Sequence, residues 1–166
     1  MEEEQVPVPL IGNAKTPTFL MVLLVLSGLN VSFGLFSQLL SIGDAPQEDL
    51  IEVVEEAFYN ADMDMDEIPT WVMPEIMDFI EHIMQNFGLI NAVDLAYYLI
   101  LLPALFLMYR LKVMGYYIYV ATQVAGVVFI PFLYGFNTIS WLMVGTFSFT
   151  ALLFIVLYTL NIKHLH

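Results

Sequence analysis

The sequence predicts an all-α integral membrane protein, a bundle of four transmembrane helices with two short amphipathic helices in an acidic external loop. Three observations support this prediction. Sixty per cent of the 166 residues are hydrophobic and only 13% are charged. The apolar residues form four runs, each close to the ~20 residues that cross a bilayer as a helix. The charges are segregated, since thirteen Asp and Glu fall within residues 44–81 and no Lys or Arg lies between Lys15 and Arg110.

Residues 1–18 are expected to form a cytoplasmic N-terminal tail. Three glutamates open it, whereas a secretory signal would begin with a basic segment. The first transmembrane helix is predicted at 19–42. Gly28 and Ser32 stand four residues apart in it, and such a pair of small residues lets another helix approach closely. This span is therefore expected to pack against protein on at least one side.

Residues 43–90 are expected to form the external loop with its two amphipathic helices. The first helix is predicted from Asp44 to near Asn60, where apolar and acidic residues alternate with helical spacing. The second is predicted to begin near Pro74 and to present an apolar face that ends at Phe87. Trp71 precedes it, a residue type favoured at the membrane interface.

Transmembrane helices 2–4 are expected within 91–161, followed by a cytoplasmic tail at 162–166. Asn91 is interpreted as the N-cap of the second span, with Asp94 in its first turn, where a carboxylate suits the positive end of a helix. A tight basic turn at 109–115 separates the second span from the third. Four tyrosines near the ends of the third span are interpreted as aromatic belts at the two membrane surfaces: Tyr116, Tyr117, Tyr119 and Tyr134.

The four basic side chains predict the orientation. With four spans, both termini lie on the same side as the turn between spans 2 and 3. Lys15, Arg110, Lys112 and Lys163 then share one face of the membrane, and positive charge favours the cytoplasmic face. We expect both termini to be cytoplasmic, in a bacterial inner (plasma) membrane, with the loop 43–90 periplasmic or extracellular.

No catalytic constellation is present. Cysteine is absent, and no Gly-x-Ser-x-Gly, His-Glu-x-x-His or P-loop sequence occurs. Nucleic-acid binding would need a basic patch, which the chain lacks. The protein is therefore expected not to be an enzyme and to hold no cofactor.

The closest approach to a metal site is the series Asp62, Asp64 and Asp66, which copies the first three ligand positions of an EF-hand. The series then departs, because Glu67 replaces the glycine of the sharp turn and Met73 replaces the bidentate glutamate. A solvated acidic loop is favoured over a weak Ca²⁺ or Mg²⁺ contact at these aspartates.

Amides and hydroxyls, rather than charges, stand at mid-depth in the spans. They are expected to hydrogen-bond between helices, with contact to a polar solute or a quinone headgroup as the alternative. These residues are Asn30, Gln123, Ser148 and Thr150. Asp94 is the only acid within an apolar run, and the alternative to its capping role is a functional group at an outer vestibule.

The segment 108–126 reads Met-Tyr-Arg-Leu-Lys-Val-Met-Gly-Tyr-Tyr-Ile-Tyr-Val-Ala-Thr-Gln-Val-Ala-Gly. A basic turn followed by aromatic residues and a glutamine resembles the tight cytoplasmic turn of small, uncharacterised four-span bacterial inner-membrane proteins. The resemblance implies a bacterial membrane setting and brings no assigned activity with it.

Three function classes follow from these features. The favoured one is a non-enzymatic accessory or scaffolding subunit of a larger membrane assembly. The alternative is a small oligomeric channel or carrier for a cation or small polar solute, in which Pro103 and Pro131 would supply broken helices. A membrane enzyme acting on a lipid or quinone would need a polar cluster that the sequence does not reveal. The expected partners are the lipid bilayer and either a membrane protein or further copies of the chain.

Overall fold

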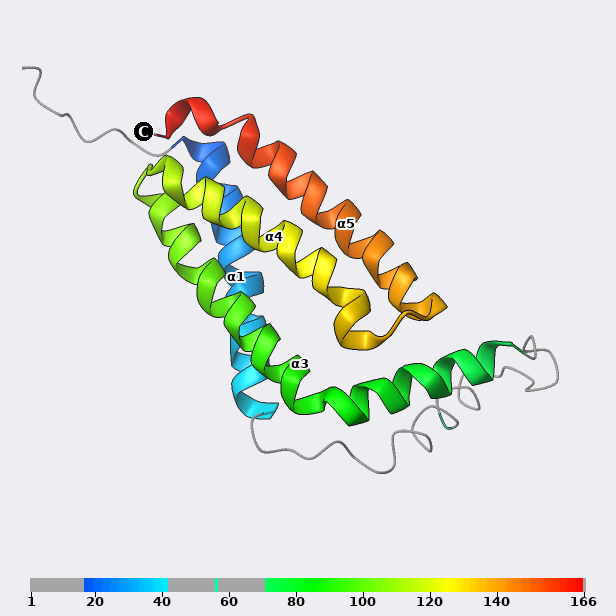
Figure 1. Ribbon diagram of the computed structural model, residues 1–166. Helices are drawn as coiled ribbons and strands as arrows, with labels where there is room; N and C mark the ends of the chain where they lie inside the picture. The colour runs from blue at the N-terminus through cyan, green and yellow to red at the C-terminus, as the bar shows by residue number, and fades with distance from the viewer. Residues whose placement is uncertain (1–16, 42–55, 57–70, 166) are drawn as a thin grey trace, which may run out of the picture.

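The structure is a computed structural model that describes residues 17–41, 56 and 71–165. Its long helices are α1 (Thr18–Ser41), α3 (Val72–Tyr109), α4 (Val113–Tyr134) and α5 (Thr138–Thr159), and a short 3₁₀ helix, η2 (Ile162–His164), follows α5 (Figure 1). Each of the four α-helices is long and apolar enough to cross a membrane. The predicted all-α class with four such helices is confirmed. The first predicted amphipathic helix lies outside the described residues.

Helix α3 is longer than either of the two helices predicted for its residues. It runs without interruption for 38 residues, so the boundary predicted at Asn91 is wrong. Neither Gly88 nor Asn91 breaks a helix as proline does, because each keeps its backbone N–H. At about 1.5 Å per residue the helix extends for about 57 Å, nearly twice a ~30 Å hydrocarbon core. Figure 1 shows how this length is accommodated: α3 bends sharply between its two halves.

The first half of α3 is held against the turn that joins α4 to α5. The backbone N–H of Thr138 donates to the Glu75 carboxylate over 2.9 Å. The rings of Phe79 and Tyr134 stack with their centroids 5.9 Å apart. These contacts attach the first half of α3, which lies outside the second predicted span, to the helix bundle.

The basic turn between α3 and α4 closes with a Schellman motif. The N–H of Lys112 donates to the carbonyl of Leu107, and the N–H of Leu111 donates to that of Met108, both over 2.9 Å. The motif needs a residue in the left-handed backbone conformation, and glycine is usual there. Here Leu111 adopts this conformation, with φ 58°. The Leu111 side chain is buried in the core, which offsets the cost of its backbone conformation.

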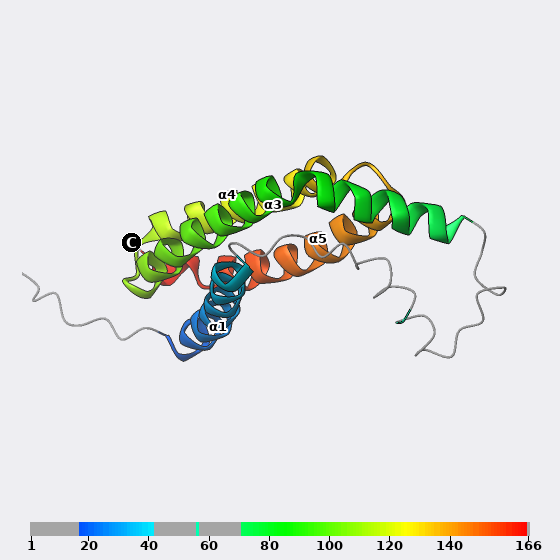
Figure 2. The same ribbon diagram turned by 90° about the horizontal axis from the view of Figure 1, so that it is seen from below.

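Helix packing is uneven around the bundle. Helix α3 packs extensively on α4 and on α1, and α5 packs on α4, whereas α1 and α5 touch little. Figure 2 shows α3 and α4 together on one side, with α1 and α5 on the other. The buried core gathers toward the end that holds the basic turn and includes Leu20, Leu23, Leu24, Leu101, Ala104, Leu105, Met108, Tyr119 and Tyr158.

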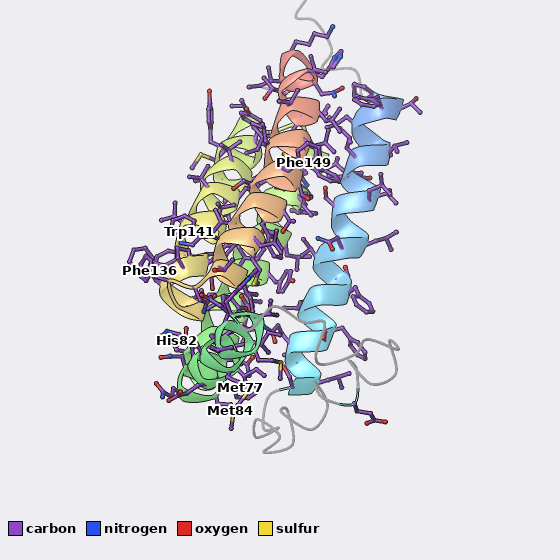
Figure 3. The ribbon with its side chains drawn as sticks, turned by 90° about the vertical axis from the view of Figure 1, so that its right-hand side faces the viewer. Met77, His82, Met84, Phe136, Trp141 and Phe149 are labelled. Atoms are coloured by element: carbon purple, nitrogen blue, oxygen red, sulfur yellow. The ribbon has the colours of Figure 1, made fainter. Side chains whose placement is uncertain are left out.

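The outward faces of the helices are apolar. Phe33 on α1 is 76% exposed and Phe149 on α5 is 71% exposed. Phe136 and Trp141 project from the α4–α5 region, while Met77 and Met84 project from the first half of α3 on the far side from them (Figure 3). Such surfaces suit contact with lipid chains and are unfavourable in water.

Candidate functional site: a polar cavity and groove inside the bundle

Asp94 lies on the inward side of α3, well within the helix. Its carboxyl accepts a hydrogen bond from the Gln38 amide of α1, with 3.1 Å between nitrogen and oxygen. The Tyr134 side chain of α4 lies beside it. Because α3 begins at Val72, Asp94 is in the middle of a helix and the capping role predicted for it is wrong. Instead it joins three helices.

A cavity of about 160 Å³ opens beside this carboxyl. Aromatic side chains and one amide, together with aliphatic residues, form its walls. The aromatic and polar lining residues are Asp94, Tyr97, Tyr98, Gln123, Phe129, Tyr134 and Phe147.

Two tyrosines of α3 shape the cavity through their contacts with neighbouring helices. The Tyr97 hydroxyl donates to the Gln123 carbonyl oxygen of α4 over 3.0 Å. Its ring fits against Gly126, where an added Cβ would lie 2.9 Å from a ring carbon. The Tyr98 ring occupies the corresponding space against Gly34 of α1. Glycines at these two positions therefore make room for both rings.

A larger groove of about 600 Å³ continues from this cavity between α1 and α5. It shares Tyr97, Tyr98, Gln123 and Phe147 with the cavity. Its further polar lining comes from α1, α4 and α5 and consists of Ser27, Asn30, Tyr119, Thr146 and Thr150. The groove marks the place where the ring of helices is least closed.

The groove ends where α1 and α5 meet. The buried Tyr158 hydroxyl donates to Ser27 Oγ over 2.8 Å, a hydrogen bond that joins these two helices directly. The Tyr158 ring packs edge-on against Tyr119 with centroids 4.9 Å apart. Nearby, the hydroxyls of Tyr116 and Thr159 are 2.8 Å apart and join α4 to α5.

The predicted polar residues fall into different environments. Gln123 bonds between helices, as described above. Asn30 is exposed and lines the groove. For Thr150 the structure differs from the prediction, because its hydroxyl donates to the Thr146 carbonyl of its own helix over 3.1 Å. Ser148 is half-buried on the same helix.

Of the charged residues singled out by the sequence, Arg110, Lys112 and Lys163 do not line the groove. Asp62, Asp64, Asp66 and Lys15 are outside the described residues. Arg110 and Lys112 form the α3–α4 turn, and Lys163 belongs to η2. Figure 1 shows this turn, the start of α1 and the C-terminal end together at one end of the bundle.

The sequence analysis missed most of the tyrosines that build the site. Tyr119 is only 2% exposed, so assigning it to an aromatic belt was wrong, whereas Tyr134 lies beside Asp94 at the end of α4. Tyr97, Tyr98 and Tyr158 were not singled out at all. The available signal was chemical: a phenol within an apolar run needs a hydrogen-bond partner, and Ser27 and Gln123 supply such partners.

The arrangement can hydrogen-bond a polar group inside the helix bundle. Among the described residues, no three His, Cys, Asp or Glu side chains group closely enough to hold a metal ion. No protein-family model, curated protein or solved structure matches the chain. The function must therefore be argued from the groove and the cavity.

Proposed function

We propose that the protein is a non-enzymatic accessory or scaffolding subunit of a larger membrane assembly. In this proposal the groove between α1 and α5 receives one transmembrane helix of a different membrane protein. The membrane is a bacterial inner membrane, both termini are cytoplasmic, and residues 43–90 face the periplasm or the exterior.

The observation that supports this proposal is the polar lining of a groove that stands open at membrane depth. Asn30 and Thr146 are exposed there. The Thr146 hydroxyl donates to carbonyls of its own helix and keeps its oxygen as an acceptor, whereas lipid chains offer no hydrogen bonds to the Asn30 amide. A second groove of about 540 Å³ lies between α1 and α3, and it differs in being lined almost entirely by apolar side chains such as Leu24 and Phe106. The hydrocarbon chains of lipids can fill the apolar groove without loss of hydrogen bonds. The polar one is better covered by a helix that carries hydrogen-bonding side chains.

Charge favours a different protein over a second copy of this chain. Thirteen acids within residues 44–81, without a single Lys or Arg, would face the same segment of another copy. Like charges at such density repel one another, although salt screens the repulsion at long range. A partner with basic residues on that side of the membrane would instead be attracted.

The test is mild extraction at native expression, followed by native mass determination and identification of the chains that migrate together. A stoichiometric, unrelated membrane protein is the expected result. The double variant Asn30→Leu/Thr146→Val should release it, because the groove would lose hydrogen bonds to the partner helix. Ser32→Leu is the matched control on the exposed side of α1 outside the groove. A monomer or pure homo-oligomer at native expression would overturn the proposal.

One observation favours the alternative of a small channel or carrier for a cation or polar solute. Polar groups follow one another from Asp94 past Tyr97 and Gln123 to Ser27, so they line much of the bundle's interior. Cation flux into liposomes that contain the purified protein alone would support this alternative. If Gln123→Leu abolished this flux in a variant that still folds, the path of the cation would be assigned to these polar groups.

A further inference from the structure

Asp94 is the only acidic residue within the apolar runs, and its polar neighbours Gln38 and Tyr134 are both uncharged. An ionised carboxylate can accept about four hydrogen bonds. The Gln38 amide accounts for one of them. The carboxyl therefore keeps acceptor capacity toward the cavity that it lines.

The Lys and Arg side chains that the structure describes are remote from this carboxyl. Arg110 follows Asp94 by 16 residues on the same helix, which corresponds to about 24 Å along the axis. Lys112 and Lys163 lie at the same end of the bundle as Arg110. A negative charge in an apolar region is costly unless a cation balances it or a proton neutralises it. Within the described residues, no Lys or Arg supplies that cation.

The walls of the cavity have the chemistry that recognises an organic cation. Five of its lining residues are aromatic, namely Tyr97, Tyr98, Phe129, Tyr134 and Phe147. Aromatic rings attract cations through their negative faces, most strongly where water is excluded, and cages of such rings bind quaternary ammonium groups. A single carboxylate and one amide suit this class of ligand better than Ca²⁺ or Mg²⁺, which need six or more oxygen ligands.

The size of the cavity limits the ligand. Its volume of about 160 Å³ is close to that of the ~150 Å³ engineered cavity that holds benzene, a molecule of six non-hydrogen atoms. A tetramethylammonium ion, with five non-hydrogen atoms, is of matching size. An amphiphile with a long chain would need the adjoining groove as well.

We propose that this cavity is a binding site for a small organic cation of the ammonium class, with Asp94 as its counter-ion and the tyrosine and phenylalanine rings as its cage. The hydrogen bond from Gln38 holds the carboxyl in position. The site does not depend on the accessory role proposed above, because its walls come entirely from this chain.

The experiment measures binding of tetramethylammonium to the full-length protein in a nonionic detergent, by isothermal titration calorimetry. Detergents with choline headgroups are avoided because they would compete. Tert-butanol, a neutral molecule of similar shape and the same number of non-hydrogen atoms, is the ligand control. Tetramethylammonium should bind at least about tenfold more tightly than tert-butanol, because only the cation interacts with the carboxylate and the rings.

Asp94→Asn keeps an acceptor for Gln38 but removes the charge, and it should weaken tetramethylammonium binding by at least about tenfold. Glu81→Gln makes the same chemical change at an exposed position on α3 and should leave binding unchanged. Tyr97→Phe keeps the ring and loses only the hydroxyl bonded to Gln123, so binding should change by less than about threefold. Circular dichroism checks that each variant is folded.

Equal binding of tetramethylammonium and tert-butanol would overturn the proposal. So would tetramethylammonium binding that survives Asp94→Asn in a folded variant. If Asp94→Asn fails to fold, Phe147→Leu replaces it as the test, since it removes one ring of the cage, and unchanged affinity in this variant would count against the site. None of these outcomes bears on whether an unrelated subunit is extracted together with the protein.

Discussion

The seam between α3 and α4 and the seam between α1 and α5 illustrate opposite ways to join helices in a membrane. At the first, Gly115 of α4 lies so close to α3 that an added Cβ would stand 2.5 Å from the Ala104 carbonyl oxygen and 2.7 Å from the Met108 nitrogen. At the second, the helices touch little, and a groove lined by hydroxyls and amides lies between residues 26–31 of α1 and 146–154 of α5.

The difference reflects what drives helix association in lipid. Water is absent there, so the hydrophobic effect does not bring helices together, and close backbone packing or hydrogen bonding must do so. The α3–α4 seam relies on a small residue and on a short turn that keeps the two helices adjacent. The α1–α5 seam relies on the Tyr158–Ser27 hydrogen bond, and elsewhere it leaves polar groups facing the groove. The α3–α4 seam is closed by residues of this chain alone, whereas the groove at the α1–α5 seam is open to another molecule.

The largest expected effect comes from Gly115→Ala. The new methyl group would meet backbone atoms of α3, which cannot rotate away as a side chain can, so the helices must separate. Gly145→Ala is the matched control, because nothing lies within 4 Å of a Cβ added there. We expect the stabilities of the two variants to differ by about 2 kcal/mol in favour of Gly145→Ala, from overpacking at one site and improved helix propensity at the other. Reversible unfolding in mixed micelles, followed by circular dichroism, measures both.

Equal stabilities for these two variants would mean that the α3–α4 seam is not closely packed at Gly115. The contrast between the two seams would then be lost.

A smaller effect is expected from Tyr158→Phe. The substitution removes the buried hydroxyl that donates to Ser27 and leaves the ring in place against Tyr119. Hydrogen bonds between membrane helices contribute roughly 0.6–2 kcal/mol, so we expect a loss of about 1 kcal/mol in the free energy of unfolding. Tyr117→Phe changes the same group on a ring that is 59% exposed and should cost less than about 0.3 kcal/mol. If Tyr158→Phe left the free energy of unfolding unchanged, α1 would be held in place by its contacts with α3 alone.

The smallest effect on the isolated protein is expected from Asn30→Leu. Asn30 is exposed in the groove, so its replacement should change the free energy of unfolding by no more than about 0.5 kcal/mol. The same unfolding assay measures it. A loss above about 1 kcal/mol would show that Asn30 stabilises the chain itself, and the groove would need no partner helix to explain this residue.

The sequence predicted the helices more reliably than their ends. Four long apolar runs were sufficient to predict four helices, because only a helix satisfies its own backbone hydrogen bonds inside a membrane. The boundary at Asn91 was wrong for a local reason: a residue type that caps helices also continues them when the preceding residues are already helical. Contacts such as that of Glu75 with Thr138, 63 residues apart, hold the first half of α3 in place, and no sequence pattern predicts them.

For the candidate site, too, some properties follow from the sequence and others only from the tertiary structure. The order of residues by itself established a chain rich in apolar spans, with thirteen of its seventeen acids within residues 44–81 and no Lys or Arg among them, since these properties depend only on the sequence. It also marked Gln123 as a polar residue that needs a partner. Only the tertiary structure decided that this partner is Tyr97, that Asp94 faces a cavity with aromatic walls, and that the bundle stays open between α1 and α5. The physical reason is that these properties depend on which faces of separate helices meet, and in lipid that choice is made by close packing and hydrogen bonds between residues far apart in the chain.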